Sequence, residues 1–195
     1  PGLRGIVLGG HGLFSWGDTA EACYENTVEL IQRAQSWLSP ERQLRGVEVF
    51  GGARVETLSE PMRDATLARL LPVLRGLCSE GGTKLMHINT STEVMEFVNS
   101  NELSTLAALG TSCPDHFLRT KIRPLVVPES VYALEGDSLK VGLGKLLSAY
   151  RADYTAYYER CKRHSSPKLR DPNPVVLLLP RIGMVTIAKD KATAR

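Results

Sequence analysis

The chain has 195 residues, of which 43% are hydrophobic, so it is long enough to fold as one large domain or two small ones around a core. Its 24 basic and 21 acidic residues give a net charge of +3 and are spread along the sequence, which with 6% aromatic content argues against a nucleic-acid partner. The apolar runs fall short of the roughly 18 residues that a membrane span requires, and four widely spaced cysteines predict reduced thiols in a cytoplasmic protein.

The N-terminal stretch predicts a hairpin followed by a helix. Residues 5–16 contain two short apolar segments, the first expected to be a buried strand, on either side of a glycine-rich turn that includes His11. Asp18 or Thr19 is suited to cap a helix whose apolar residues recur every three or four positions. We expect Pro40 to end this helix.

Beyond a polar, glycine-containing join that extends to residue 58, strands and helices alternate. A helix bent by Pro72 comes first, and an irregular segment is expected from residue 110. This helix is expected to begin at Ser59 and to run through Leu77, and the other expected helices are residues 92–99, 102–109 and 139–161. The expected strands are 84–88, 124–128, 175–179 and 184–188. The densest basic stretch, residues 160–168, is interpreted as a solvated helix end. This order predicts an α/β fold in which helices cover a sheet in two or three layers.

The two predicted hairpins resemble each other. Setting Gly183 against Gly12 aligns the apolar segments on both sides of each turn, which predicts that one strand-turn-strand-helix unit occurs twice. Ile182 then stands at the position of His11, and isoleucine cannot bind a metal. The second unit is therefore predicted to be a degenerate copy that kept the scaffold and lost the chemistry. Chance similarity between two apolar hairpins is the alternative.

Residues 5–17 read Gly-Ile-Val-Leu-Gly-Gly-His-Gly-Leu-Phe-Ser-Trp-Gly and precede an acidic amphipathic helix. This segment resembles the His-Gly-Leu signature of the class II aldolase/adducin family. Glycines on both sides leave the imidazole of His11 uncrowded. In that family the matching histidine is the third zinc ligand, and the zinc polarises the carbonyl of a ketose phosphate to stabilise the enediolate left by carbon–carbon cleavage. The resemblance therefore implies that His11 binds zinc.

The same resemblance implies a His-x-His pair and an acidic acid/base residue upstream of the motif. This sequence contains no such pair, because no two of its four histidines lie within five residues of each other. Catalytic zinc sites usually have three protein ligands. We therefore expect the chain to be inactive by itself, and we assign no catalytic residue to it.

A closer resemblance covers more of the chain. Residues 110–121 and 179–195 are similar to the middle region of bifunctional rhamnulose-1-phosphate aldolase/short-chain alcohol dehydrogenase proteins, although Arg181 stands where those proteins usually have glycine. This implies that residues 1–40 end a zinc-dependent aldolase unit and that residues 41–195 form a linking α/β unit. It also implies a ketose 1-phosphate substrate, a role in rhamnose catabolism, a fused dehydrogenase and a homo-oligomer.

A further group of polar residues lies in the segment 113–121. Arg119 and Lys121 are candidates for binding the phosphate of a substrate, because a guanidinium and an ammonium both suit that dianion. The alternative is a loop that only packs at a domain junction, with its shape fixed by Pro114. For the whole chain, the alternative function is a non-catalytic adducin-like scaffold or interdomain docking module, which would tolerate replacement of His11.

Overall fold

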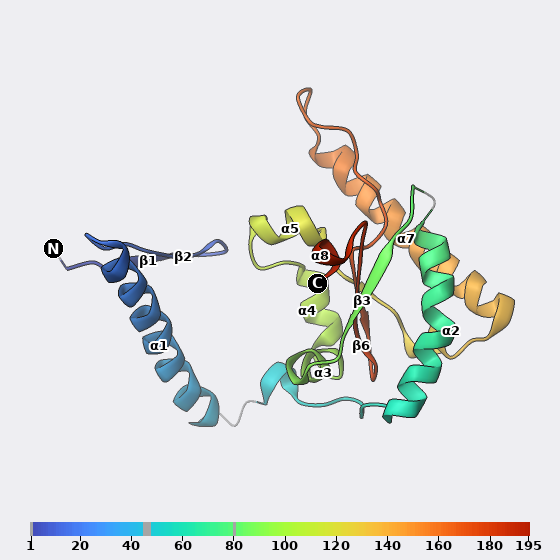
Figure 1. The fold of residues 1–195 in the computed structure, drawn as a ribbon, viewed down its shortest axis with the longest axis horizontal. Helices are drawn as coiled ribbons and strands as arrows, with labels where there is room; N and C mark the ends of the chain where they lie inside the picture. The colour runs from blue at the N-terminus through green and yellow to red at the C-terminus, as the bar shows by residue number, and fades with distance from the viewer. Residues whose placement is uncertain (1, 45–47, 80) are drawn as a thin grey trace.

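The computed structural model describes residues 2–44, 48–79 and 81–195 (Figure 1). Strands β1 (Gly5–Leu8) and β2 (Gly12–Ser15) pair in an antiparallel hairpin, and helix α1 (Ala20–Leu44) packs on both. Thr19 caps α1, because its Oγ1 accepts a hydrogen bond from the Ala22 N–H at 3.1 Å. The predicted hairpin and helix are confirmed. In Figure 1 this N-terminal unit lies to one side of the rest of the chain.

Two predictions for this unit are wrong. Helix α1 continues through Pro40 to Leu44, because a proline removes one main-chain hydrogen bond that a helix can lose by bending. Strand β1 is not buried, since the exposed fractions of Ile6 and Val7 are 51% and 74%. An apolar strand is buried only where other elements cover it, and here α1 is the main element that packs on the hairpin among those that the structure describes. Residues 45–47 of the predicted join lie outside the described residues.

The rest of the described chain is organised around a four-stranded sheet. Its strands lie in the order β3-β6-β5-β4, with β4 parallel to β5 and the other neighbours antiparallel. The strands are β3 (Leu85–Asn89), β4 (Leu125–Val126), β5 (Val176–Leu179) and β6 (Gly183–Ala188). The helices are α2 (Glu60–Cys78), α3 (Thr92–Val98), α4 (Leu103–Leu109), α5 (Pro114–Thr120), α6 (Glu129–Tyr132), α7 (Gly136–Cys161) and α8 (Lys191–Ala194), after a 3₁₀ turn at Val49–Gly51.

Helices cover both faces of this sheet. Successive strand residues point to opposite faces, and Leu177 and Leu179 accordingly belong to a core with α2, α6 and α7, whereas Leu178 packs with Val98 of α3 and Leu103 of α4. Figure 1 shows α2 and α7 on one side of the sheet and α3 and α4 on the other. The predicted α/β fold is confirmed, in its three-layer form.

The sequence interpretation missed α5 and the short helix α6. The segment expected to be irregular contains α5, which begins at Pro114 and ends at Thr120. Proline is favoured in the first turn of a helix, where its missing N–H costs no hydrogen bond. The turn-forming residues before it therefore mark the start of a helix rather than a continuing loop.

The two hairpins share their turn geometry. Leu8 pairs with Gly12 in the first hairpin, and Leu179 pairs with Gly183 in the second. The His11 N–H donates to the Leu8 carbonyl at 3.0 Å, and at the same offset the Ile182 N–H donates to the Leu179 carbonyl at 3.1 Å. The registers and turns of the two hairpins therefore agree residue for residue.

The agreement extends to the positive φ angle in each turn and to the cap of the following helix. Gly10 and Arg181 occupy equivalent positions with φ of 70° and 66°. Downstream, Asp190 caps α8 by accepting from the Thr193 N–H at 2.8 Å, which is the equivalent of the Thr19 cap of α1. This match supports the predicted repeat over chance similarity, because turn dihedrals, register and cap do not follow from apolar composition.

Arg181 shows how the second copy holds a conformation that favours glycine. Its N–H donates to Asn99 Oδ1 at 2.6 Å, and its side chain donates to the Glu56 carbonyl at 3.0 Å and lies 3.5 Å from a Glu129 carboxylate oxygen. These contacts offset the strain of a positive φ in a residue with a Cβ.

Candidate functional site

His11 stands at the turn between β1 and β2 and is exposed to solvent. Its ring centroid lies 5.5 Å from that of Phe14. Over the described part of the chain, no group of three or more His, Cys, Asp or Glu side chains is placed to hold a metal ion. One imidazole supplies a third of the usual protein ligands of a catalytic zinc. The described residues therefore do not fit a zinc ion by themselves, and the assignment of His11 as a ligand stays a prediction.

Arg119 and Lys121 line a common cleft. The cleft measures about 520 Å³ and lies between α5, the C-terminal half of α7, the segment 166–175 and the end of β6. Among the described residues, seven cationic side chains and one carboxylate, that of Asp171, line it. The cations are Lys84, Arg119, Lys121, Lys162, Lys168, Arg170 and Lys189. Three tyrosines of α7 complete the lining: Tyr154, Tyr157 and Tyr158.

Lys121 has the most constrained position of these cations. It follows α5 with a φ of 69°, and among the described residues it is the one charged residue that is buried. Its ammonium lies 3.9 Å from the centroid of the Tyr154 ring and donates a hydrogen bond to the Asp171 carbonyl. Burial lowers the pKa of Lys121, and the positive charges of the nearby Arg170 and Lys84 lower it further. The Asp171 carboxylate acts in the opposite direction and raises this pKa.

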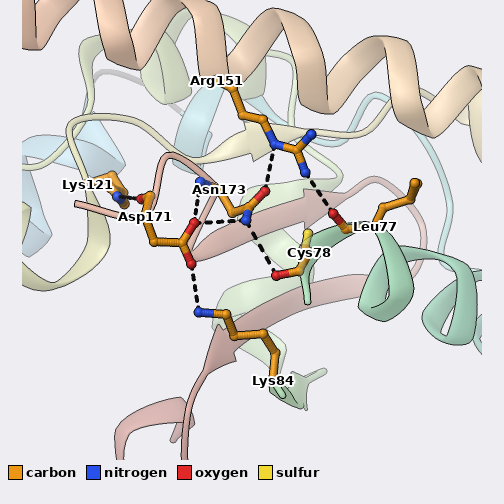
Figure 2. A network of polar contacts seen from close by, with 7 residues as sticks. All are labelled: Leu77, Cys78, Lys84, Lys121, Arg151, Asp171 and Asn173. Carbon is orange, nitrogen blue, oxygen red and sulfur yellow. Dashed lines mark hydrogen bonds and ion pairs between the residues drawn. The ribbon is translucent and has the colours of Figure 1, made fainter. Parts of the chain in front are cut away.

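A hydrogen-bond network forms one wall of the cleft (Figure 2). The Asp171 carboxylate accepts from Lys84 at 2.6 Å, and from the main-chain and side-chain N–H groups of Asn173 at 2.9 and 2.8 Å. Burial raises the pKa of Asp171, but the hydrogen bonds from Lys84 and Asn173 outweigh it and hold the pKa below its usual value. The single carboxylate of the cleft is therefore ionised and already paired.

The same network ties the cleft wall to the helices behind it. Asn173 accepts from Arg151 Nε of α7 at 2.8 Å and donates to the Cys78 carbonyl at 3.4 Å, and Arg151 Nη2 donates to the Leu77 carbonyl at 2.7 Å. Leu77 and Cys78 end α2, where carbonyls lack partners within the helix. Figure 2 shows Arg151 reaching down from α7 toward the end of α2. The network fixes α2, α7 and the segment 171–173 to one another.

Two cations of the cleft, Arg119 and Lys168, have no partner of opposite charge among the described residues. Lys162 pairs with Glu159 at 2.5 Å and Arg170 donates to the Leu118 carbonyl at 3.2 Å. The head groups of Arg119, Lys168 and Lys189 make no hydrogen bond or ion pair to any other described residue. Unpaired cations around one concave, partly apolar surface favour an anionic ligand over a purely structural role.

Sequence interpretation found two of these residues and missed the rest. Arg119 and Lys121 were identified by their charge, whereas Lys84, Lys189 and the tyrosines come from distant segments that only the fold brings together. The basic stretch 160–168, interpreted as a solvated helix end, is exposed at Lys162 and Lys168, and both residues also line the cleft. The signal that could have found it is the row of tyrosines on the same helix immediately before that stretch.

No helix among the described residues has the length and the apolar content that crossing a bilayer requires. Comparison with known proteins gave two findings. The profile of a family described as "Aldolase class II, second domain" matches residues 65–195. An uncharacterized oxidoreductase of Bacillus subtilis (strain 168), YuxG, is 34% identical over 200 residues, an alignment that covers 100% of this chain and 28% of that protein. No solved structure gives a significant match.

Proposed function

Because the chain belongs to the class II aldolase family, whose second domain its residues 65–195 match, we propose that it is part of a zinc-dependent sugar-phosphate aldolase. In this proposal residues 1–40 end the catalytic unit, residues 41–195 form the second domain, and His11 is one of the zinc ligands. The substrate is a ketose 1-phosphate, with rhamnulose 1-phosphate proposed from the sequence resemblance. Class II aldolases generally use zinc, which polarises the substrate carbonyl when bound.

The observation that carries the proposal is the contrast between the two hairpins. Ile6 and Phe14 of the first hairpin are 51% and 46% exposed, while Leu177 and Val185, at the equivalent positions, are fully buried. The second hairpin is covered by helices on both faces and flanked by β3 and β4. By this equivalence, other elements should also pack on the exposed apolar side chains of the first hairpin. An exposed apolar surface of this kind marks an interface.

A further part of the catalytic unit would supply that cover together with the missing metal ligands. His11 is exposed at the turn, so residues from a covering segment or a neighbouring subunit can approach its imidazole. The chain spans 28% of the length of YuxG, which leaves room in such a protein for the rest of the aldolase. Its name as an oxidoreductase supports a fused dehydrogenase, and we extend that arrangement to the intact form of this protein.

The test compares the intact protein with two histidine variants. Zinc content and the cleavage of rhamnulose 1-phosphate to dihydroxyacetone phosphate and lactaldehyde are measured for wild type, His11→Ala and His164→Ala. His164 is the matched control because it is equally exposed and lies after α7, outside the hairpin. We expect His11→Ala alone to lose zinc and to lower the cleavage rate by about 100-fold or more, since even residues behind the metal ligands matter by 10–100-fold.

Other outcomes would count against this assignment. Wild-type zinc content in His11→Ala would refute the ligand role. An intact protein without zinc or cleavage activity would favour the non-catalytic scaffold, which tolerates the loss of His11. Cleavage of a different ketose 1-phosphate would keep the aldolase and change only the proposed sugar.

A further inference from the structure

We propose that the cleft between α5 and α7 binds a nucleotide, with its phosphates against the cations and its base against the tyrosines of α7. The site is separate from the proposed zinc centre, because none of its lining residues comes from the first hairpin (β1 and β2) or from α1. The nucleotide-binding proposal can therefore be tested independently of the proposed aldolase activity.

The charge of the cleft selects an anion. The one carboxylate among the described lining residues, that of Asp171, bonds to Lys84 and Asn173 and also acts on the nearby Lys121, so it balances only part of the positive charge. Arg119 and Lys168 stand unpaired among the described residues, and Lys189 has the adjacent Asp190 as its opposite charge; the three lie on different parts of the wall. Guanidinium and ammonium groups that converge from several sides are suited to the distributed charge of a diphosphate.

The aromatic lining selects a ligand with a flat ring. Tyr154 and Tyr157 present rings inclined by 27° to each other, with centroids 6.5 Å apart. The ammonium of Lys121 lies over Tyr154, so cationic and aromatic surfaces adjoin within the site. Nucleobases stack on tyrosine rings, and such stacking contributes about 1–3 kcal/mol for each base.

A bare sugar phosphate fits the lining less well. Recognition of several sugar hydroxyls needs free polar groups, but the cleft's amide and carboxylate, Asn173 and Asp171, already bond to each other. The Tyr158 hydroxyl donates to the Pro167 carbonyl at 2.6 Å, and the Ser166 hydroxyl accepts from the Arg163 N–H. The remaining surface is mainly apolar, as a base requires. The volume of about 520 Å³ is typical of small-molecule sites.

The experiment is calorimetric titration of the 195-residue chain with ADP, and with adenosine, inorganic phosphate and rhamnulose 1-phosphate for comparison. We expect ADP to bind at least about tenfold more tightly than each of the other three, because only ADP reaches both the cations and the rings. ADP affinity should also fall as salt is raised.

Three variants separate the two halves of the site. Arg119→Gln should weaken ADP by about tenfold, which is the effect of one lost charge-assisted hydrogen bond. Tyr157→Leu should weaken ADP by about fivefold or more while leaving the affinity for inorganic phosphate unchanged. Lys145→Gln is the matched control, because Lys145 is exposed on α7 outside the lining, and it should bind like wild type. Circular dichroism of each variant confirms the fold.

The proposal is overturned if the wild-type chain does not bind ADP, or if ADP binds no more tightly than inorganic phosphate. Tighter binding of rhamnulose 1-phosphate than of ADP also overturns it, and would assign Arg119 and Lys121 to the sugar phosphate instead. Equal weakening by Lys145→Gln and Arg119→Gln would place the interaction outside the cleft.

Discussion

Asn173→Ala should destabilise the domain of residues 48–195 by about 2–3 kcal/mol. The amide of Asn173 is nearly buried and joins the Arg151 guanidinium at 2.8 Å, the Asp171 carboxylate at 2.8 Å and the Cys78 carbonyl at 3.4 Å. A hydrogen bond to a charged group contributes about 1.5–3 kcal/mol and a neutral one about 0.5–1.5. The expected loss lies below the sum of these ranges, about 3.5–7.5 kcal/mol, because Asp171 is exposed and Arg151 is half-buried, so water replaces part of each lost hydrogen bond.

Urea unfolding followed by circular dichroism measures this loss, and the melting temperature should fall by about 5–10 °C for a chain of this size. Asn101→Ala is the matched control, because the Asn101 side chain is exposed and makes one hydrogen bond, to the Gly51 carbonyl at 2.7 Å. Both tryptophans, Trp16 and Trp37, lie in the N-terminal unit, so their emission should report a separate and unshifted transition. A loss below about 0.5 kcal/mol, or one equal to that of Asn101→Ala, would refute the role of the network.

Three further substitutions, one of them with a control at Gly144, test the fold around the second hairpin and the cleft wall. Ile182→Ala should cost about 2–5 kcal/mol in urea unfolding, because Ile182 is fully buried in the core, and a loss under about 1 would contradict that. Gly183→Ala should be destabilising by more than about 1 kcal/mol, since its φ is 138° and an added Cβ would lie 2.6 Å from a backbone oxygen, whereas Gly144→Ala in open helix should stabilise by about 0.5–1. The stability advantage of wild type over Asp171→Asn should be full above the usual pKa of 3.8 and be lost as the pH falls through the lowered pKa of Asp171. An advantage that stays constant as the pH is lowered from neutral until acid unfolds the protein would exclude the carboxylate as its source.

Periodicity predicted most of the fold. The sheet strands are short apolar runs bounded by glycine and proline, and the alternation of Leu177, Leu178 and Leu179 between two cores accounts for their unbroken apolar sequence. The repeat was also visible, because glycines at positive φ, such as Gly12 and Gly183, are required by the turn itself.

Other features depend on contacts that a single sequence does not reveal. Whether β1 is buried depends on what covers it, and Pro40 ends a helix only if the chain cannot bend there. The cleft joins residues from Lys84 to Thr193, and its pairing of charges depends on distances set by the fold. Sequence could identify Arg119 and Lys121 as cations, but it could not place them beside the tyrosines.

The most direct test of the central claim is a zinc-loaded crystal structure of the intact protein. We predict that an imidazole nitrogen of His11 lies about 2.0–2.1 Å from the zinc, with two further ligands from outside the described chain and with Ile6 and Phe14 buried as their counterparts are. A structure in which His11 faces solvent, or in which the zinc is held without it, would contradict the proposal that the first hairpin is the active version of the repeated unit.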